Sequence, residues 1–232
     1  MSKNMQEMFL VIADISGYTK FMLTSRTELV HSQGIISDLL HAVIAQFEMP
    51  LTISKFEGDA IFIYAEKNDK HDWQAVKDML GSKLFAFIES FDRKLKELAE
   101  VNICPCKACL GMNKLKLKVV AHYGQVLKYE ISGHAELSGV DVIIVHRLLK
   151  NNLPVNKYIL LSESAQQQLA IDRDWQKTVA AYPDDVGNIP IYWLALETPE
   201  IAVKANWLNI GDMARKIKYD LMKIGNLFKN KN

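Results

Sequence analysis

The sequence predicts an α+β fold built around the element order β-α-β-β-α-β, and three kinds of pattern support it. Apolar runs of about four to eight residues indicate strands, whereas apolar residues three and four positions apart indicate helices. Two β-rich runs separated only by Glu57 to Asp59 indicate a hairpin. The elements are a strand at 8–14, a helix at 29–47, strands at 51–56 and 60–64, a helix at 73–100 and a strand at 115–120. This order is that of a ferredoxin-like unit, in which the first and third strands are neighbours.

The second half of the chain extends this unit. His122 to Gln125 is interpreted as a turn that leads into a strand at 126–131. A helix at 142–149, a strand at 158–161 and strands near 179 and at 191–195 follow. The domain that contains these elements is expected to occupy residues 1–200.

Residues 201–232 are expected to form a separate C-terminal segment, a basic amphipathic helix. Between 206 and 228 apolar residues recur on one face, while lysine and arginine residues decorate the rest. We expect this helix to pack on its own domain or on a second copy of the chain, because surface helices with lysines are common. Contact with a membrane surface or another protein is the less favoured alternative.

The composition is that of an ordinary globular protein. The 28 Lys and Arg residues nearly balance the 27 Asp and Glu residues, so the formal net charge is +1 and no nucleic-acid partner is expected. The apolar stretch before Asp14 is too short for the core of a signal peptide, and no run approaches the length of a membrane span. A cytoplasmic location is therefore expected.

Two aspartates are the strongest candidates for a functional site. Asp14 ends the first predicted strand, and Asp59 lies in the hairpin turn. Because the first and third strands are neighbours, the two carboxylates can meet at one rim of the sheet and offer hard oxygen ligands to Mg²⁺ or Mn²⁺. The glycine-containing segment after Asp14 leads into a helix whose first N–H groups can hold a polyphosphate. The alternative is a helix cap at Asp14 and a turn residue at Asp59, and spacing alone does not decide between the two.

Four short motifs, taken in order, resemble those of class III adenylyl and guanylyl cyclases. They are ADISGYTKFM at 13–22, K-x-x-G-D at 55–59, HYGQV at 122–126 and the segment from Glu136 to Leu148. Each motif is short, but their order is far more specific, and the resemblance covers roughly residues 8–196. The chain is most similar to an uncharacterised bacterial branch of this superfamily. The implied fold is the ferredoxin-like core of class III cyclases with extra strands and a C-terminal helix.

The resemblance implies a role for each matching residue. Asp14 and Asp59 correspond to the aspartates that bind two Mg²⁺ or Mn²⁺ ions, which position the ribose 3′-hydroxyl for attack on the α-phosphorus. Arg147 corresponds to the arginine that stabilises charge in the transition state. Lys55 corresponds to the lysine that reads the base, and Glu136 falls at the position of its partner. Backbone contacts to the phosphates would come from Ile15, Ser16, Gly17, Tyr18 and Thr19.

The resemblance also implies a nucleoside triphosphate ligand, with ATP favoured, and a head-to-tail homodimer whose protomers share each site. Two departures weaken the match. Ile143 stands where the family has an asparagine that orients the ribose, and an aliphatic side chain cannot make that hydrogen bond. The segment 184–188 has two acids where the family has a lysine that grips the triphosphate. Weak or absent turnover is therefore expected.

Two functions of different classes follow from these observations. The first is metal-dependent binding of a nucleoside triphosphate and its cyclisation to a 3′,5′-cyclic nucleotide with release of pyrophosphate, at low or conditional activity. The second is a catalytically degenerate cyclase homologue that acts as a nucleotide-binding or metal- or redox-sensing regulatory protein. The sequence leaves both open.

The three cysteines lie within one six-residue segment as Cys104, Cys106 and Cys109. An odd number so closely spaced does not indicate a disulfide framework. Thiolates at C-x-C-x-x-C spacing are candidate ligands of Zn²⁺, with a fourth ligand from a histidine or another chain. A reduced or redox-sensitive loop is the alternative. No histidine stands beside the segment in the sequence, so the fourth ligand is not identified.

Overall fold

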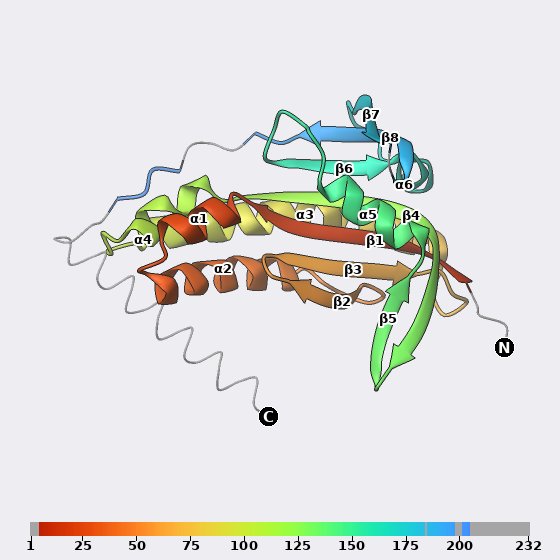
Figure 1. The fold of residues 1–232 in the computed structure, drawn as a ribbon, viewed down its shortest axis with the longest axis horizontal. Coiled ribbons are helices and arrows are strands. Elements are labelled where there is room, and N and C mark those ends of the chain that lie inside the picture. Colours follow the sequence, from red (N-terminus) through yellow and green to blue (C-terminus); the bar gives the residue numbers. More distant parts are fainter. Residues whose placement is uncertain (1–4, 184, 198–200, 205–232) are drawn as a thin grey trace.

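The computed structural model describes residues 5–183, 185–197 and 201–204, which form an α+β domain around one large mixed sheet (Figure 1). The predicted helix at 206–228 and the expected division at residue 200 lie outside the described residues. Within the described ranges, no helix is both long and apolar enough to cross a membrane.

The sheet has the strand order β2-β3-β1-β4-β6-β8-β7, and β5 pairs with β4 beside this path. The strands are β1 (Met5–Ser16), β2 (Thr52–Glu57), β3 (Ala60–Glu66), β4 (Lys116–Ile131), β5 (His134–Ser138), β6 (Tyr158–Ser162), β7 (Gln176–Tyr182) and β8 (Gly187–Ala195). β1 is central and runs antiparallel to both β3 and β4. The predicted ferredoxin-like order is therefore confirmed, with the first and third strands as neighbours.

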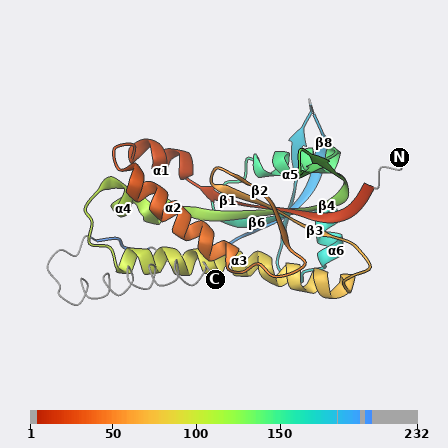
Figure 2. The ribbon, with the colours of Figure 1, turned by 90° about the horizontal axis from the view of Figure 1, so that it is seen from below.

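Helices cover both faces of the sheet. They are α1 (Tyr18–Thr24), α2 (Leu29–Ile44), α3 (Trp73–Glu100), α4 (Lys107–Gly111), α5 (Val140–Leu149) and α6 (Glu163–Leu169), with the 3-10 turn η1 (Met112–Lys114). The longest of them, α3, begins where the Asp72 side chain accepts a hydrogen bond from the Gln74 N–H, as an N-cap does. α2 and α3 pack against each other on one face (Figure 2), whereas α5 packs on β1 and β4 from the other.

The alternation of side chains along β1 builds two separate apolar cores. Phe9 and Val11 are buried toward α2 and α3. Leu10 and Ile12 are buried on the opposite face with Leu148 of α5. Because both faces of β1 are covered, its sequence is a continuous apolar run rather than an alternating one. The first charged side chain beyond that run is Asp14, which continues the face that α5 covers.

The structure differs from the sequence-based expectation at β4. The predicted turn at 122–125 is wrong, because β4 is one continuous strand that pairs with β1 without interruption from Lys116 to Leu127. His122 is buried there and has polar partners on both ring nitrogens, so a polar residue does not end the strand. The strand β5 was not predicted. It follows a tight turn in which Ser132 and Gly133 both have positive φ, as a two-residue hairpin turn requires.

Candidate functional site

The two predicted aspartates lie at the same rim of the sheet. In the β1–β3 ladder Asp14 pairs with Ala60, and Asp59 directly precedes Ala60 in the turn between β2 and β3. Gly58 permits this turn because its φ is +68°. The predicted neighbourhood of the first and third strands therefore brings the two carboxylates together.

A positively charged side chain that the sequence analysis did not single out completes this rim. Lys118 on β4 pairs with Asp14 across the β1–β4 ladder, and its Nζ lies 2.9 Å from Asp14 Oδ2. Both side chains are largely buried, with 20% and 15% of their surfaces exposed. A signal for this lysine was present, because residue 118 alternates in phase with buried Val120 and so points to the α5 face.

Asp59 is held in an environment that disfavours its negative charge. Burial, followed by the nearby charge of Asp14, raises the pKa of Asp59 from 3.8 to about 6, although Lys118 acts in the opposite direction. One ammonium group therefore neutralises only part of the charge of the two carboxylates. Carboxylate oxygens are the ligands that Mg²⁺ and Mn²⁺ prefer, so the rim offers donor atoms of the type that a divalent cation needs.

The segment after Asp14 forms a tight loop that includes Gly17. Ile15 is buried in the core, and Ser16 ends β1. Gly17 has a φ of +89°, and a Cβ at this position would lie 3.2 Å from the carbonyl oxygen of Lys114. Any other residue would be strained there, so the loop needs glycine. Tyr18 and Thr19 begin the seven-residue helix α1, at whose start no side chain caps the backbone N–H groups.

Lys55 belongs to a second charged group, on β2 and α5. Its Nζ lies 3.5 Å from Glu57 Oε1, and the other oxygen of Glu57 lies 3.6 Å from His146 Nδ1. The His146 ring also packs against Phe62, with ring centroids 5.1 Å apart, and burial lowers its pKa. Glu136 lies on β5, and among the described ion pairs none joins it to Lys55. The predicted base-reading pair is therefore not among the ion pairs of the described residues, although β2 and β5 contact each other.

The Arg147 side chain pairs with an acidic residue of the same chain. Its Nε donates a hydrogen bond to Asp185 in the turn between β7 and β8, and Tyr182 of the same hairpin donates to the Arg147 carbonyl oxygen at 2.6 Å. Asp185 belongs to the acidic segment 184–188. The guanidinium and this acid therefore neutralise each other, a contact that no local sequence pattern indicates.

A buried polar network links β4 to α5 and β6. His122 Nδ1 lies 2.8 Å from Ser162 Oγ, and His122 Nε2 lies 2.8 Å from Asp141 Oδ1. Asp141 also accepts a hydrogen bond from the Gln125 N–H at 2.9 Å. Gly124 leaves room for it, since a Cβ there would lie 2.2 Å from the Asp141 carboxyl carbon. Ser162 and His122 are 1% and 5% exposed, so this serine–histidine–aspartate arrangement secures α5 and is closed to substrate.

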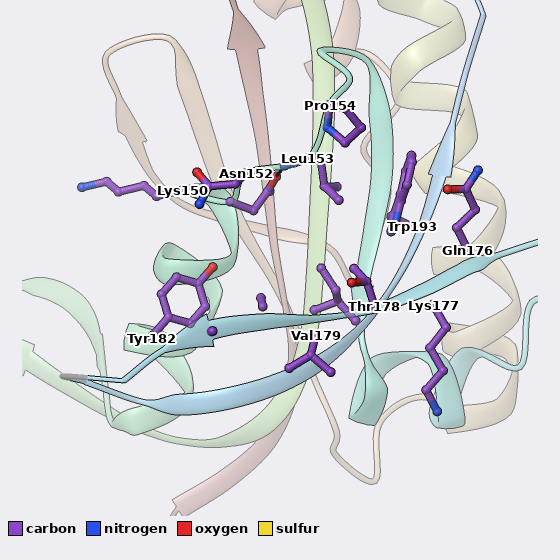
Figure 3. A pocket seen from close by; sticks show the side chains of 14 residues that line it. Lys150, Asn152, Leu153, Pro154, Gln176, Lys177, Thr178, Val179, Tyr182 and Trp193 are labelled. Atoms are coloured by element: carbon purple, nitrogen blue, oxygen red, sulfur yellow. Dashed lines mark hydrogen bonds between the residues drawn. The ribbon is translucent and has the colours of Figure 1, made fainter.

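A pocket of about 530 Å³ lies beside the hairpin of β7 and β8 (Figure 3). It lies between the loop after α5 and the strands β7 and β8, and Asn152, Val179, Tyr182 and Trp193 are among its lining residues. The predicted site residues are not among those that line it. The rim at Asp14 is therefore a separate feature of the surface.

The three cysteines converge with a histidine that the sequence analysis did not connect to them. His31 of α2 lies 73 residues before Cys104, yet its Nδ1 is within 3.5 Å of the sulfur atoms of Cys104, Cys106 and Cys109. The sequence does not indicate this contact, because the packing of α2 on α4 creates it.

Comparison with known sequences finds relatives without an assigned function. A family model described as "Protein of unknown function (DUF2652)" matches residues 36–158. The uncharacterized protein Rv2561/Rv2562 of Mycobacterium tuberculosis (strain ATCC 25618 / H37Rv) is 27% identical over 169 residues, which cover 72% of this chain and 76% of that protein.

Comparison with solved structures finds nucleotidyl cyclases. The adenylyl cyclase CyaB from P. aeruginosa matches with a TM-score of 0.60 and 12% identity over 86% of this chain and 99% of that one. The guanylyl cyclase Cya2 matches with a TM-score of 0.58 and 13% identity over 88% and 100%. A dimeric guanylyl cyclase domain of the RhoGC fusion protein from the aquatic fungus Blastocladiella emersonii matches with a TM-score of 0.56 and 17% identity over 82% and 96%. The fold is that of class III adenylyl and guanylyl cyclase domains.

Proposed function

Because this chain belongs to the DUF2652 family and has the fold of class III cyclase domains, we propose that it binds a nucleoside triphosphate with Mg²⁺ or Mn²⁺ and cyclises it conditionally. The observation that carries this proposal is the pair of carboxylates at one rim, Asp14 beside Asp59, next to the Gly17 loop. ATP is the favoured substrate, and the products are a 3′,5′-cyclic nucleotide and pyrophosphate.

The donor set at the rim fits a divalent cation. Asp14 and Asp59 supply oxygen ligands, and Asp14 already holds one positive charge, the ammonium of Lys118. A bound cation would activate the ribose 3′-hydroxyl and neutralise charge on the phosphates. The chain's own contribution is then to position the triphosphate, with Lys118 beside the cation site and the backbone of Ile15 to Thr19 close to it.

Activity would require that two copies pair and that Arg147 is released from Asp185. Exposed apolar side chains on β2 and α5 support pairing of two copies: Phe56 is 56% exposed, Val140 64% and Ile143 46%. In a head-to-tail pair Arg147 would serve the partner's rim. Arg147 would first have to leave Asp185, so the ion pair within the chain lowers turnover.

The direct test is incubation of the purified protein with each of the four ribonucleoside triphosphates and Mn²⁺, followed by chromatography for cyclic products. A cyclic product that disappears in Asp59→Asn and persists in Asp174→Asn, an exposed aspartate far along the chain, would support the proposal. Neither product nor metal-dependent binding at high protein concentration would refute it.

A second function is favoured by two specific observations. Arg147 is paired with Asp185, and Ile143 stands where the resemblance to class III cyclases implies a ribose-orienting asparagine. A degenerate homologue that binds nucleotide and regulates a partner protein would share the rim but lack turnover. Metal-dependent binding of the triphosphate without any cyclic product would identify this function.

Weakening the ion pair between Arg147 and Asp185 is expected to raise turnover. In Asp185→Asn the charge-assisted hydrogen bond to Arg147 is weakened, so the guanidinium is released toward the partner's site. We expect kcat to increase about five- to tenfold, with little change in KM, in an assay of cyclic product with Mn²⁺. Asp174→Asn is the control and should match the parent chain. An unchanged or lower kcat in Asp185→Asn would mean that the pair does not restrain Arg147.

A further inference from the structure

One imidazole and three thiols from separate parts of the chain converge at one point. His31 comes from α2, Cys104 precedes α4, Cys106 caps its start and Cys109 lies within it. The His31 Nδ1 atom lies 3.3 Å from Cys106 Sγ and 3.5 Å from both Cys104 Sγ and Cys109 Sγ. All four ligand atoms are within 4.8 Å of one another.

A hydrogen bond from His31 does not account for the position of all three sulfur atoms. A single ring nitrogen carries either one proton or one lone pair, so it makes one good hydrogen bond at a time. Here one nitrogen faces three sulfur atoms at nearly equal distances. All three cysteines lie among the described residues, and none is in a disulfide.

The distances match a tetrahedral metal site. With Zn–S bonds of about 2.3 Å and a Zn–N bond of about 2.05 Å, tetrahedral angles place each sulfur about 3.6 Å from the nitrogen. The observed values of 3.3 and 3.5 Å are close to that edge length. We propose that His31, Cys104, Cys106 and Cys109 bind one Zn²⁺ ion as a closed Cys₃His site.

The surrounding backbone holds the ligands in place. Cys106 Sγ accepts a hydrogen bond from the Cys109 N–H at 3.4 Å, so one ligand orients another. The side chain of Asn102 bonds both the N–H and the carbonyl group of Cys104, each at 3.0 Å. Such outer contacts fix the ligands before the metal arrives. His31 is exposed, which gives the ion access from solvent.

The position of the site indicates a structural role. α4 packs against both α1 and α2, and the residues after it form η1 before β4 begins. A Zn²⁺ ion would tie α2 to this connection across more than 70 positions of sequence. Its presence is independent of the proposed cyclase activity, because no ligand belongs to the rim at Asp14.

The test is the metal content and the Co²⁺ spectrum of the full-length chain, purified without a metal-affinity tag. We expect about one Zn²⁺ per protomer, and after exchange for Co²⁺ the thiolate-to-metal and visible bands of tetrahedral coordination. In His31→Ala the affinity for Zn²⁺ should fall at least about tenfold. His41→Ala, on the same helix and also exposed, should leave it unchanged.

Three results would overturn the site. They are a zinc content far below one per chain together with no Co²⁺ bands, equal affinity in His31→Ala and His41→Ala, and a disulfide among the three cysteines in the freshly purified protein. The Co²⁺ titration of the parent chain decides the matter even if a variant fails to fold. A cyclase assay without product would leave this proposal untouched.

Discussion

Replacement of Asp14 by alanine is expected to lower the affinity for the Mn²⁺–triphosphate complex at least about 100-fold, which corresponds to about 2.7 kcal/mol of binding free energy. The change removes one of the two carboxylates at the rim and leaves the Lys118 ammonium in its place, so a divalent cation meets repulsion where it had a ligand. Equilibrium dialysis with labelled triphosphate, with and without Mn²⁺, measures the effect.

The same substitution also affects folding, and a second variant separates the two effects. Lys118 is only 20% exposed, so loss of its partner should destabilise Asp14→Ala by about 1–3 kcal/mol. Asp14→Ala combined with Lys118→Met removes the unpaired charge and should recover most of that stability, as measured by urea unfolding. Triphosphate binding should remain lost in the double variant. Normal affinity there would refute the two-carboxylate rim.

Replacement of Asp59 by asparagine is expected to stabilise the metal-free protein above pH 6. The folded-state pKa of Asp59 is raised from 3.8 to about 6, so between these values the folded chain holds a proton that the unfolded chain releases. The free energy of unfolding therefore falls as pH rises through this window. Because Asp59 is only half-buried, we expect a gain of about 1–2 kcal/mol for Asp59→Asn at pH 7.5 and a smaller one at pH 4.5.

With added Mn²⁺ the parent chain should be more stable than Asp59→Asn. The metal binds the folded parent chain and stabilises it by mass action, whereas Asp59→Asn lacks one ligand and gains less. Urea unfolding of both proteins from pH 4.5 to 7.5, with and without Mn²⁺, gives the full comparison, and Asp174→Asn controls for loss of a surface charge. Lower stability of Asp59→Asn at every pH without metal would show that the Asp59 carboxylate is held by favourable contacts.

The central fold could be predicted because its signals are local. The apolar run of β1, the helical spacing of α3 and the short Glu57–Asp59 separation each depend on a few consecutive residues. The neighbourhood of Asp14 and Asp59 then follows from the order of the elements. The predicted turn at 122–125 failed for a related reason: the partners that satisfy buried His122 lie on α5 and β6, far along the chain.

The charge balance of the candidate site depends on contacts that only the folded chain creates. Lys118 reaches Asp14 across a sheet ladder, and Arg147 meets Asp185 through the packing of a hairpin on α5. His31 joins the cysteines because α2 packs on α4. The partners are at least 38 positions apart along the chain, and no spacing rule covers such distances. Residue types at the site were therefore predictable, but their partners were not.

Because β4 is continuous, it fixes the distance between the groups at its two ends. Its 16 residues follow a path of about 50 Å at about 3.3 Å per residue. Lys118 lies near one end, beside Asp14, and the other end carries the β5 hairpin with Glu136. The length of β4 therefore sets the distance between the rim at Asp14 and the β5 hairpin of the same chain. One residue inserted in β4 would turn the β5 hairpin onto the opposite face of the sheet. Most substitutions in β4 would leave the distance between its two ends unchanged.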